Sequence, residues 1–539
     1  MSLKKGRGQI NSITLAAALV ALSSLLSRFL GVIRDRILAG QFGAGESLDI
    51  YYAAFRVPDL IFNLVVLGAL SAGFIPVFTN LLKKDEDEKN NEAWKLASNV
   101  LNFLSLAIFL LSLLGIIFVN PLVRLIVPGF SPEAQLTTAK LTRIMFLSPL
   151  FLGISGVLGG ILQSTKRFLV YSIAPVAYNL GIIFGALYLF RWFGIYGLAW
   201  GVVIGALLHA AIQLPAVLRL GFKWSMVLDW RDKNTRKIGR MMVPRTLSLA
   251  VSQIDALITT VIASLLPGGT LTIFNLANNL QSFPVGIFGV SFAIAAFPSF
   301  SENAFNPEIL VKKFTSTMRQ IIFFVIPTTV FIITLRAQII RVVLGSGSFD
   351  WNDTVLTMNA LGLFSISLVA QAAAPLLVRV FYARHNSKTP LYIGLVSVAV
   401  DILLSWFLGM RMGSAGLALA VSISSAINFI LLWLFLYIEV PTLNSFPIFI
   451  TALKYSAAAL LAGVAIQISK VAIWPYIDMT RFYGVFIQLL VSISAGTLVY
   501  AFICKMLGSE EMDSFLGAIK GRWRFKKVTV EDQSEARGN

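Results

Sequence analysis

The chain has 539 residues, of which 57% are hydrophobic and 13% are charged, with 44 Lys and Arg against 26 Asp and Glu. A soluble globule keeps a polar exterior and cannot hide so much apolar surface, which excludes an ordinary soluble enzyme, a disordered chain and a disulfide scaffold. One Cys and two His leave no basis for a metal site, and the net charge of +18 fits the inner loops of a membrane protein better than a nucleic-acid binder.

Fourteen apolar stretches are each long enough to cross the hydrocarbon core of a membrane, which takes about 20 helical residues. Each is expected to be a helix, because an open strand leaves backbone groups unsatisfied in lipid. They lie at residues 12–39, 50–80, 96–119, 137–162, 169–190, 195–218, 241–265, 271–300, 316–340, 354–380, 390–410, 413–438, 449–470 and 483–507. The sequence therefore predicts an all-α polytopic membrane protein with about fourteen transmembrane helices.

The distribution of Lys and Arg predicts how these spans are oriented. If the N-terminus is cytoplasmic, the basic residues gather on the inner loops, above all at 219–240 and in the tail at 520–527, whereas the outer loops carry few. Basic residues mark the cytoplasmic side of membrane proteins, so we expect both termini in the cytoplasm. The outer loops are too short for a catalytic domain, and we expect neither an enzyme nor a cofactor.

The chain resembles itself at an offset of about 220 residues. Three patterns recur in the same order, pairing Asn120–Val127 with Arg336–Leu344, Ser164–Phe168 with Asn386–Pro390, and Gly194–Ala199 with Gly413–Ala418. Each copy holds six helices, an even number, so both copies cross the membrane in the same direction and are related by an axis along its normal. Two such lobes facing each other can open to either side in turn, which is the architecture of a transporter.

The repeat also predicts the domain organisation. We expect an N-lobe at 1–219, a basic cytoplasmic linker at 220–240 and a C-lobe at 241–438. Two further helices follow at 439–507, outside the repeat, and a basic cytoplasmic tail covers 508–539.

Charged side chains inside the first two spans are the strongest indication of a binding site, because intramembrane charges are costly. The first span holds Arg28, Arg34 and Asp35, and the second holds Arg56. Arg28 lies about 23 Å along its helix, far from the cytoplasmic face. Guanidinium groups match phosphate oxygens in pairs, which favours a cationic wall for an anionic substrate. The alternative is that Arg28 pairs with Asp35 or Asp49 inside one lobe.

Two lone acids lie in later spans, Asp255 in the seventh and Asp401 in the eleventh. One interpretation is a site for Na⁺ or H⁺ that couples an ion gradient to transport, with Thr259, Ser397 and Ser405 as oxygen donors. In the other interpretation, each acid hydrogen-bonds a neighbouring helix. The membrane potential is a further source of driving force.

Seven stretches of the sequence match, in order, the pattern of one known family. They are Ser27–Asp35, Gln41–Gly45, Asp49–Pro58, Gly68–Phe78, Gln163–Pro175, Phe283–Val290 and Phe381–Pro390. From about residue 10 to 507 the chain resembles the MurJ/MviN family, the lipid II flippases of bacterial peptidoglycan synthesis within the multidrug/oligosaccharidyl-lipid/polysaccharide exporter superfamily. The resemblance implies fourteen helices in two six-helix lobes, a central cavity for the diphosphate of an undecaprenyl-linked sugar-peptide, and a groove for the lipid tail at the last two helices.

The resemblance also implies site residues and partners. By position, Arg28, Arg34, Asp35, Asp49 and Arg56 are expected to bind substrate or to be needed for flipping. The expected location is the bacterial plasma membrane, where a monomer would meet lipid II, membrane lipids and partners from cell-wall synthesis.

The sequence departs from the family pattern at positions that usually carry charge. The second span has Phe62, Asn63 and Leu67 where the family has an Arg or a pair of Arg and then an acid, and Asn279 stands in Ala277–Leu280 where the family has Arg. A diphosphate would therefore meet fewer positive charges. The favoured function is transport of lipid II to the outer leaflet by alternating access, and the alternative is a flippase for another polyprenyl-diphosphate-linked oligosaccharide.

Two other classes fit the sequence less well. A membrane-embedded polymerase or glycosyltransferase would need an acid on a sizeable outer loop, and the outer loops are short. A multidrug antiporter for cations would have acids, rather than arginines, in its first lobe.

Overall fold

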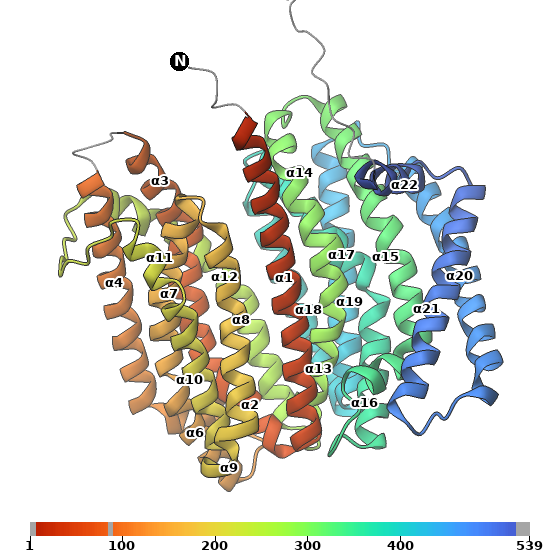
Figure 1. Cartoon of the computed structure of the whole chain (residues 1–539), viewed down its shortest axis with the longest axis horizontal. Coiled ribbons are helices and arrows are strands. Elements are labelled where there is room, and N and C mark those ends of the chain that lie inside the picture. The colour runs from red at the N-terminus through yellow and green to blue at the C-terminus, as the bar shows by residue number, and fades with distance from the viewer. Residues whose placement is uncertain (1–6, 85–89, 524–539) are drawn as a thin grey trace, which may run out of the picture. The chain divides into compact units, whose positions relative to one another are not determined.

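The structure is a computed structural model that describes residues 7–84 and 90–523, and every regular element in this part of the chain is a helix (Figure 1). The helices up to residue 218 are α1 (Arg7–Phe42), α2 (Glu46–Phe62), α3 (Ile75–Lys84), α4 (Asn90–Ile117), α5 (Val119–Ile126), α6 (Pro132–Met145), α7 (Leu147–Ser164), α8 (Phe168–Phe184), α9 (Phe190–Phe193), α10 (Tyr196–Ala211) and α11 (Leu214–Leu218). The later ones are α12 (Lys233–Ser264), α13 (Thr270–Pro284), α14 (Ser291–Glu302), α15 (Pro307–Val343), α16 (Trp351–Ile366), α17 (Leu368–Ala383), α18 (Lys388–Met412), α19 (Ser414–Glu439), α20 (Phe446–Ile473), α21 (Phe482–Met506) and α22 (Glu510–Trp523).

Short π-helical and 3₁₀ turns join some of these helices into longer ones. The π-helical turns are η1 (Asn63–Leu67), η2 (Leu70–Phe74), η3 (Gly185–Leu189) and η4 (Val285–Val290), and a 3₁₀ turn, η5 (Trp474–Tyr476), follows α20. Such π-helical turns accommodate an extra residue in a helix and often mark functional positions.

The predicted membrane architecture is confirmed. Twelve helical stretches among the described residues are long and apolar enough to cross a membrane, and α16 with α17 forms a thirteenth that is bent by 45°. They coincide with the predicted spans from the second to the last. The remaining predicted span, 12–39, falls on α1, where the side chains of residues 12–22 lie outside the described part of the structure.

The chain forms two compact units. The first consists of Met1–Phe283, Arg336–Ala370 and Asn386–Leu434, and the second of Pro284–Leu335, Gln371–His385 and Phe435–Asn539. All of the predicted site residues belong to the first unit.

Glycines bring α8 and α10 into close contact in the first unit. A Cβ atom on Gly181 would lie 2.3 Å from the Cα of Gly205, and one on Gly185 would lie 2.5 Å from the Cα of Gly201. No side chain fits between backbones at that distance, and small residues are what allows membrane helices to approach so closely. This contact positions Tyr178 on α8 beside α10.

Local backbone geometry repeats at the offset seen in the sequence. Gly194 and Gly413 both have positive φ, 57° and 62°, immediately before a new helix begins. Lys166 and His385 are the two non-glycine residues of the described chain with positive φ, at 61° and 60°, and each lies in the turn between two long helices. Such values cost energy for residues with a Cβ, so their recurrence supports the internal repeat.

In the second unit, α20 and α21 pack against α15 through polar as well as apolar contacts. The Tyr500 hydroxyl donates to the carbonyl of Phe323 at 2.8 Å, and Lys470 Nζ donates to the carbonyl of Thr334 at 3.1 Å. The C-terminal helix α22 is held by Arg319 on α15, whose Nε lies 2.7 Å from a carboxylate oxygen of Glu511.

Candidate functional site

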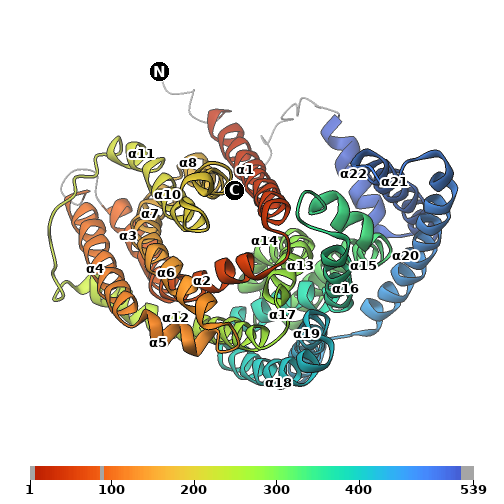
Figure 2. The same ribbon diagram turned by 90° about the horizontal axis from the view of Figure 1, so that it is seen from below.

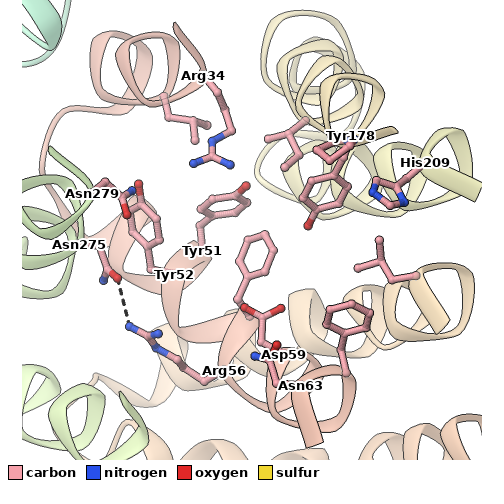
Figure 3. Close-up of a pocket in the computed structure, with 16 residues that line it drawn as sticks. Arg34, Tyr51, Tyr52, Arg56, Asp59, Asn63, Tyr178, His209, Asn275 and Asn279 are labelled. Carbon is pink, nitrogen blue, oxygen red and sulfur yellow. Dashed lines mark hydrogen bonds between the residues drawn. The ribbon is translucent and has the colours of Figure 1, made fainter. Parts of the chain in front are cut away.

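A cavity of about 430 Å³ lies in the first unit, with side chains from α1, α2, α7, α8, α10 and α13 on its walls. Figure 2 looks along these helices, and Figure 3 shows the lining side chains. The polar residues that line it are Arg34, Tyr51, Tyr52, Arg56, Asp59, Asn63, Tyr178, His209, Asn275 and Asn279. A polar cavity among apolar helices is where a transporter is expected to hold its substrate.

The shape of α2 explains how one helix brings so many side chains to this cavity. Pro58 removes a backbone donor within α2, and the π-helical turn η1 follows directly at Asn63. Both features loosen the regular helix at the level of Arg56 and Asp59.

Arg34 is the charged centre of the cavity wall formed by α1. Its Nη2 and Nε lie 2.8 and 3.0 Å from Oδ1 of Asp35, and its Nη1 donates to Oδ1 of Asn179 at 3.2 Å. Asn279 on α13 donates to the other oxygen of Asp35 at 3.0 Å. Asp35 thus holds Arg34 in place while 23% of the Arg34 side chain stays exposed to the cavity.

Arg28 lies in a smaller neighbouring cavity of about 160 Å³, which Arg34, Asp35 and Asn279 also line. Its guanidinium carbon lies 5.8 Å from the centre of the Phe283 ring, a distance typical of a cation–π contact. Arg28 makes no salt bridge with Asp35 or Asp49 among the described residues, so the structure does not support that pairing.

Arg56 points toward α13 from the opposite wall. Its Nη2 donates to Oδ1 of Asn275 at 3.1 Å, drawn as the dashed line in Figure 3. Its buried Nε has no hydrogen-bond partner among the described residues. A guanidinium with an unused donor beside a cavity can donate to a phosphate oxygen at low cost in desolvation.

Aromatic and imidazole side chains complete the cavity, and the sequence had given no reason to select them. Tyr51 and Tyr52 come from α2, Tyr178 from α8 and His209 from α10 (Figure 3). His209 is oriented by a contact of 2.6 Å between its Nδ1 and the hydroxyl of Ser155. The paired tyrosines lie inside one of the family-like stretches, which was the one available signal.

Asp49 lies outside both cavities and caps a helix. Its two carboxylate oxygens accept hydrogen bonds from the backbone amides of Gly269 and Thr272, at 2.6 and 2.7 Å, and from the Thr272 hydroxyl at 2.7 Å. These amides belong to the start of α13, where a helix favours a negative charge. Asp49 is therefore a link between α2 and α13 rather than a wall of the cavity.

Further hydrogen bonds join the turns at the same end of the first unit, where α1 ends and α2 begins (Figure 1). The amide of Ala44 donates to Asp353 Oδ2 at 2.9 Å, that of Ser348 to the Gly40 carbonyl at 2.7 Å, and that of Gly129 to the Ser264 hydroxyl at 3.3 Å. We call the residues in these bonds and in the Asp49 cap the turn cluster: Gly40, Ala44, Asp49, Gly129, Ser264, Gly269, Thr272, Ser348 and Asp353. A substrate could not pass between these turns unless the bonds opened.

The two predicted ion-coupling residues lie together. Asp255 on α12 and Asp401 on α18 are close enough for their carboxyl groups to interact, and Ser424 on α19 donates to Oδ1 of Asp401 at 3.0 Å. Within the described chain, Oδ1 of Asp255, Oδ2 of Asp401 and the hydroxyl of Ser405 are buried without hydrogen-bond partners. Two carboxyl groups this close require a shared proton or a cation.

Of the other predicted oxygen donors, Ser397 bonds the Ile393 carbonyl and Asn428 instead, and Thr259 is buried. Among the described residues, no group of three or more His, Cys, Asp or Glu side chains could hold a metal ion.

Comparisons with known proteins agree on the family. The model of the family "Lipid II flippase MurJ" matches residues 38–490. "Probable lipid II flippase MurJ" of Buchnera aphidicola subsp. Acyrthosiphon pisum is 30% identical, over 92% of this chain and 98% of its own, and "Lipid II flippase MurJ" of Burkholderia cenocepacia is 27% identical, over 76% and 81%.

Solved structures show the same fold. The structure titled "Lipid II flippase MurJ, inward closed conformation" superposes with a TM-score of 0.75 at 24% identity, over 91% of this chain and 99% of its own. An inward-facing multidrug resistance transporter of the MATE family, in the MOP superfamily, gives 0.62 at 15% identity, over 79% and 98%. With a family model that covers most of its length and helices that match throughout, the chain belongs to the MurJ family of lipid II flippases.

Proposed function

We propose that this flippase holds the diphosphate of lipid II in the larger cavity, between Arg34 and Arg56, while it moves the lipid across the membrane. The observation that supports this position is a pair of guanidinium groups on facing walls of a cavity within apolar helices. Arg34 keeps its exposed edge and Arg56 an unused donor, and guanidinium groups bind phosphate oxygens in pairs. Arg28, in the adjoining cavity, extends the cationic path.

Alternating access predicts the order in which the headgroup enters the cavity and leaves it. With both termini in the cytoplasm, as Lys and Arg predict, the turn cluster lies at the outer face and the headgroup enters from the inner leaflet. Rocking of the predicted lobes, 1–219 and 241–438, would break the turn cluster and release the headgroup outside. The protein supplies no bond chemistry in this cycle; its residues bind a charged group, exclude lipid from it and change which side it faces.

Transport is driven by the binding of an ion at Asp255 and Asp401. A cation or proton between the two carboxylates neutralises them, and its binding pulls α12, α18 and α19 together around Asp255, Asp401 and Ser424. An ion that binds one state better than the other shifts the equilibrium between them toward that state. Transport then follows the ion gradient.

Neutralising Asp401 is expected to uncouple transport from the ion. In proteoliposomes, wild-type transport should rise with external or internal Na⁺, whereas Asp401→Asn should transport at a Na⁺-independent rate reduced by about tenfold or more. Asp513→Asn, an exposed acid on α22, is the matched control and should behave as wild type. A response to pH instead of Na⁺ would identify the ion as a proton; indifference of the wild type to both would contradict the ion site.

Complementation tests the function in cells. Expression in a bacterium depleted of its own lipid II flippase should restore growth, and transport should need no second subunit, since we propose a monomer.

One observation favours an alternative cargo. Asn279 has an amide where the family pattern has Arg, and this amide donates a hydrogen bond to Asp35. If a well-expressed chain fails to restore growth but moves another polyprenyl-diphosphate-linked oligosaccharide in vesicles, the alternative holds.

A further inference from the structure

One wall of the larger cavity carries a carboxylate that no described residue contacts through a hydrogen bond or salt bridge. Asp59 on α2 lines the cavity and makes no hydrogen bond or salt bridge with any residue that the structure describes. Asp59 is half-buried, and a charge within a membrane helix is expensive unless it has a close partner. The missing partner of Asp59 is therefore expected to come from outside the chain.

Two polar neighbours of Asp59 form hydrogen bonds with other residues. Asn63, one turn later on the same face, donates its amide to Oε1 of Gln253 at 3.2 Å. His209 uses its Nδ1 on Ser155. In Figure 3, the Asp59 carboxylate points into the cavity between Asn63 and the wall that carries Tyr178.

Arg56 lies three residues before Asp59, a spacing at which opposite charges on a helix commonly pair. Instead it donates to Asn275, at 3.1 Å, and attracts Asp59 only through space, without a salt bridge (Figure 3). The cavity wall thus presents a cation and an anion about 5 Å apart along the helix. A ligand that satisfies both must itself carry an anionic and a cationic group.

The cationic group is better explained as an ammonium than as a metal ion. Asp59 is the one carboxylate among the residues that line this cavity, and metal ions in proteins usually need several anionic ligands. A primary ammonium has three donors and a single charge, which suits a single carboxylate on a cavity wall such as that of Asp59.

We propose that Asp59 binds a primary ammonium group of the transported headgroup while Arg34 and Arg56 bind its phosphates. This rests on the proposed function and specifies the substrate class: a lipid-linked diphosphate sugar-peptide whose peptide carries a free amino side chain. The resulting ammonium–carboxylate contact is a charge-assisted hydrogen bond in a partly dehydrated site, among the strongest single contacts that a headgroup can make.

Two synthetic lipids test this directly. Both carry the same diphosphate, sugars and peptide, but in one the amino side chain of the peptide is free and in the other it is acetylated. The purified full-length protein should bind the free-amine lipid about tenfold more tightly, the effect of one charge-assisted hydrogen bond. Asp59→Asn should bind both lipids equally, at the affinity that the wild type shows for the acetylated lipid.

Asp513→Asn, with the same chemical change on the exposed face of α22, should keep the wild-type preference. Equal affinity of the wild type for the two lipids would overturn the role of Asp59 and leave the flippase function standing. Binding of neither lipid would instead count against the proposed function. Because the comparison of lipids on the wild type needs no variant, poor folding of Asp59→Asn would not obscure the answer.

Discussion

Replacing Arg34 by Ala is expected to abolish lipid II transport, lowering the rate by about 100-fold or more. The substitution removes the cavity's best-positioned guanidinium and leaves Asp35 with a single donor, Asn279 at 3.0 Å. Loss of one member of a buried ion pair typically costs about 3–5 kcal/mol. Arg34→Lys keeps the charge but cannot donate two parallel hydrogen bonds to one phosphate, and an intermediate rate is expected. Transport is measured in proteoliposomes by protection of a labelled headgroup.

A double variant separates substrate binding from structural support. If Arg34 matters only because it neutralises Asp35, then Arg34→Ala with Asp35→Asn should restore transport, since no unpaired carboxylate remains. If Arg34 binds phosphate, the double variant should stay inactive although it folds. Arg191→Ala, an exposed arginine on α9, serves as the control for loss of a positive charge. Recovery of the double variant would therefore remove Arg34 from the substrate site.

The features of the fold and site that could be predicted are those that depend on residues close together in the sequence. Apolar runs predicted the spans because burial in lipid demands about 20 consecutive apolar residues, whatever the helices pack against. The sequence suggested Arg28 as the possible partner of Asp35, whereas the structure pairs Asp35 with its neighbour Arg34. The contact between Asp35 and Asn279 could not be predicted, because it depends on how α1 packs beside α13.

Residues of the cavity and of the ion site that are far apart in the sequence could not be brought together by sequence reasoning. Asp255 and Asp401 could be selected singly as intramembrane acids, but only the packing of α12 against α18 shows that they face each other. Tyr178 and His209 gave no signal because aromatic residues are common in membrane helices, and only the cavity distinguishes them. Asp49 was predicted from family resemblance as a substrate residue; its place at the start of α13 follows from a turn that hydropathy does not reveal.

Replacing Asp49 by Ala is expected to open the turn cluster. Three donors, the amides of Gly269 and Thr272 and the Thr272 hydroxyl, lose their acceptor at once. A helix cap is worth about 1–2 kcal/mol, and hydrogen bonds to a charged group about 1.5–3 kcal/mol each. The closed state should lose enough stability to shift the population toward the outward-open one.

Cysteine labelling measures this shift, since Cys504 is the single Cys of the chain and is buried. In a Cys504→Ser background, a reporter cysteine at the buried Ala44 should react with a membrane-impermeant maleimide about tenfold faster in Asp49→Ala than in the parent. Asp49→Asn, which keeps one acceptor oxygen, should fall between them, and Asp478→Ala in an exposed loop should change nothing. If transport fell while labelling of Ala44→Cys stayed slow, Asp49 would act on the substrate and not on the gate. Faster labelling from outside would also place the turn cluster, and with it the turn between α1 and α2, at the outer face of the membrane.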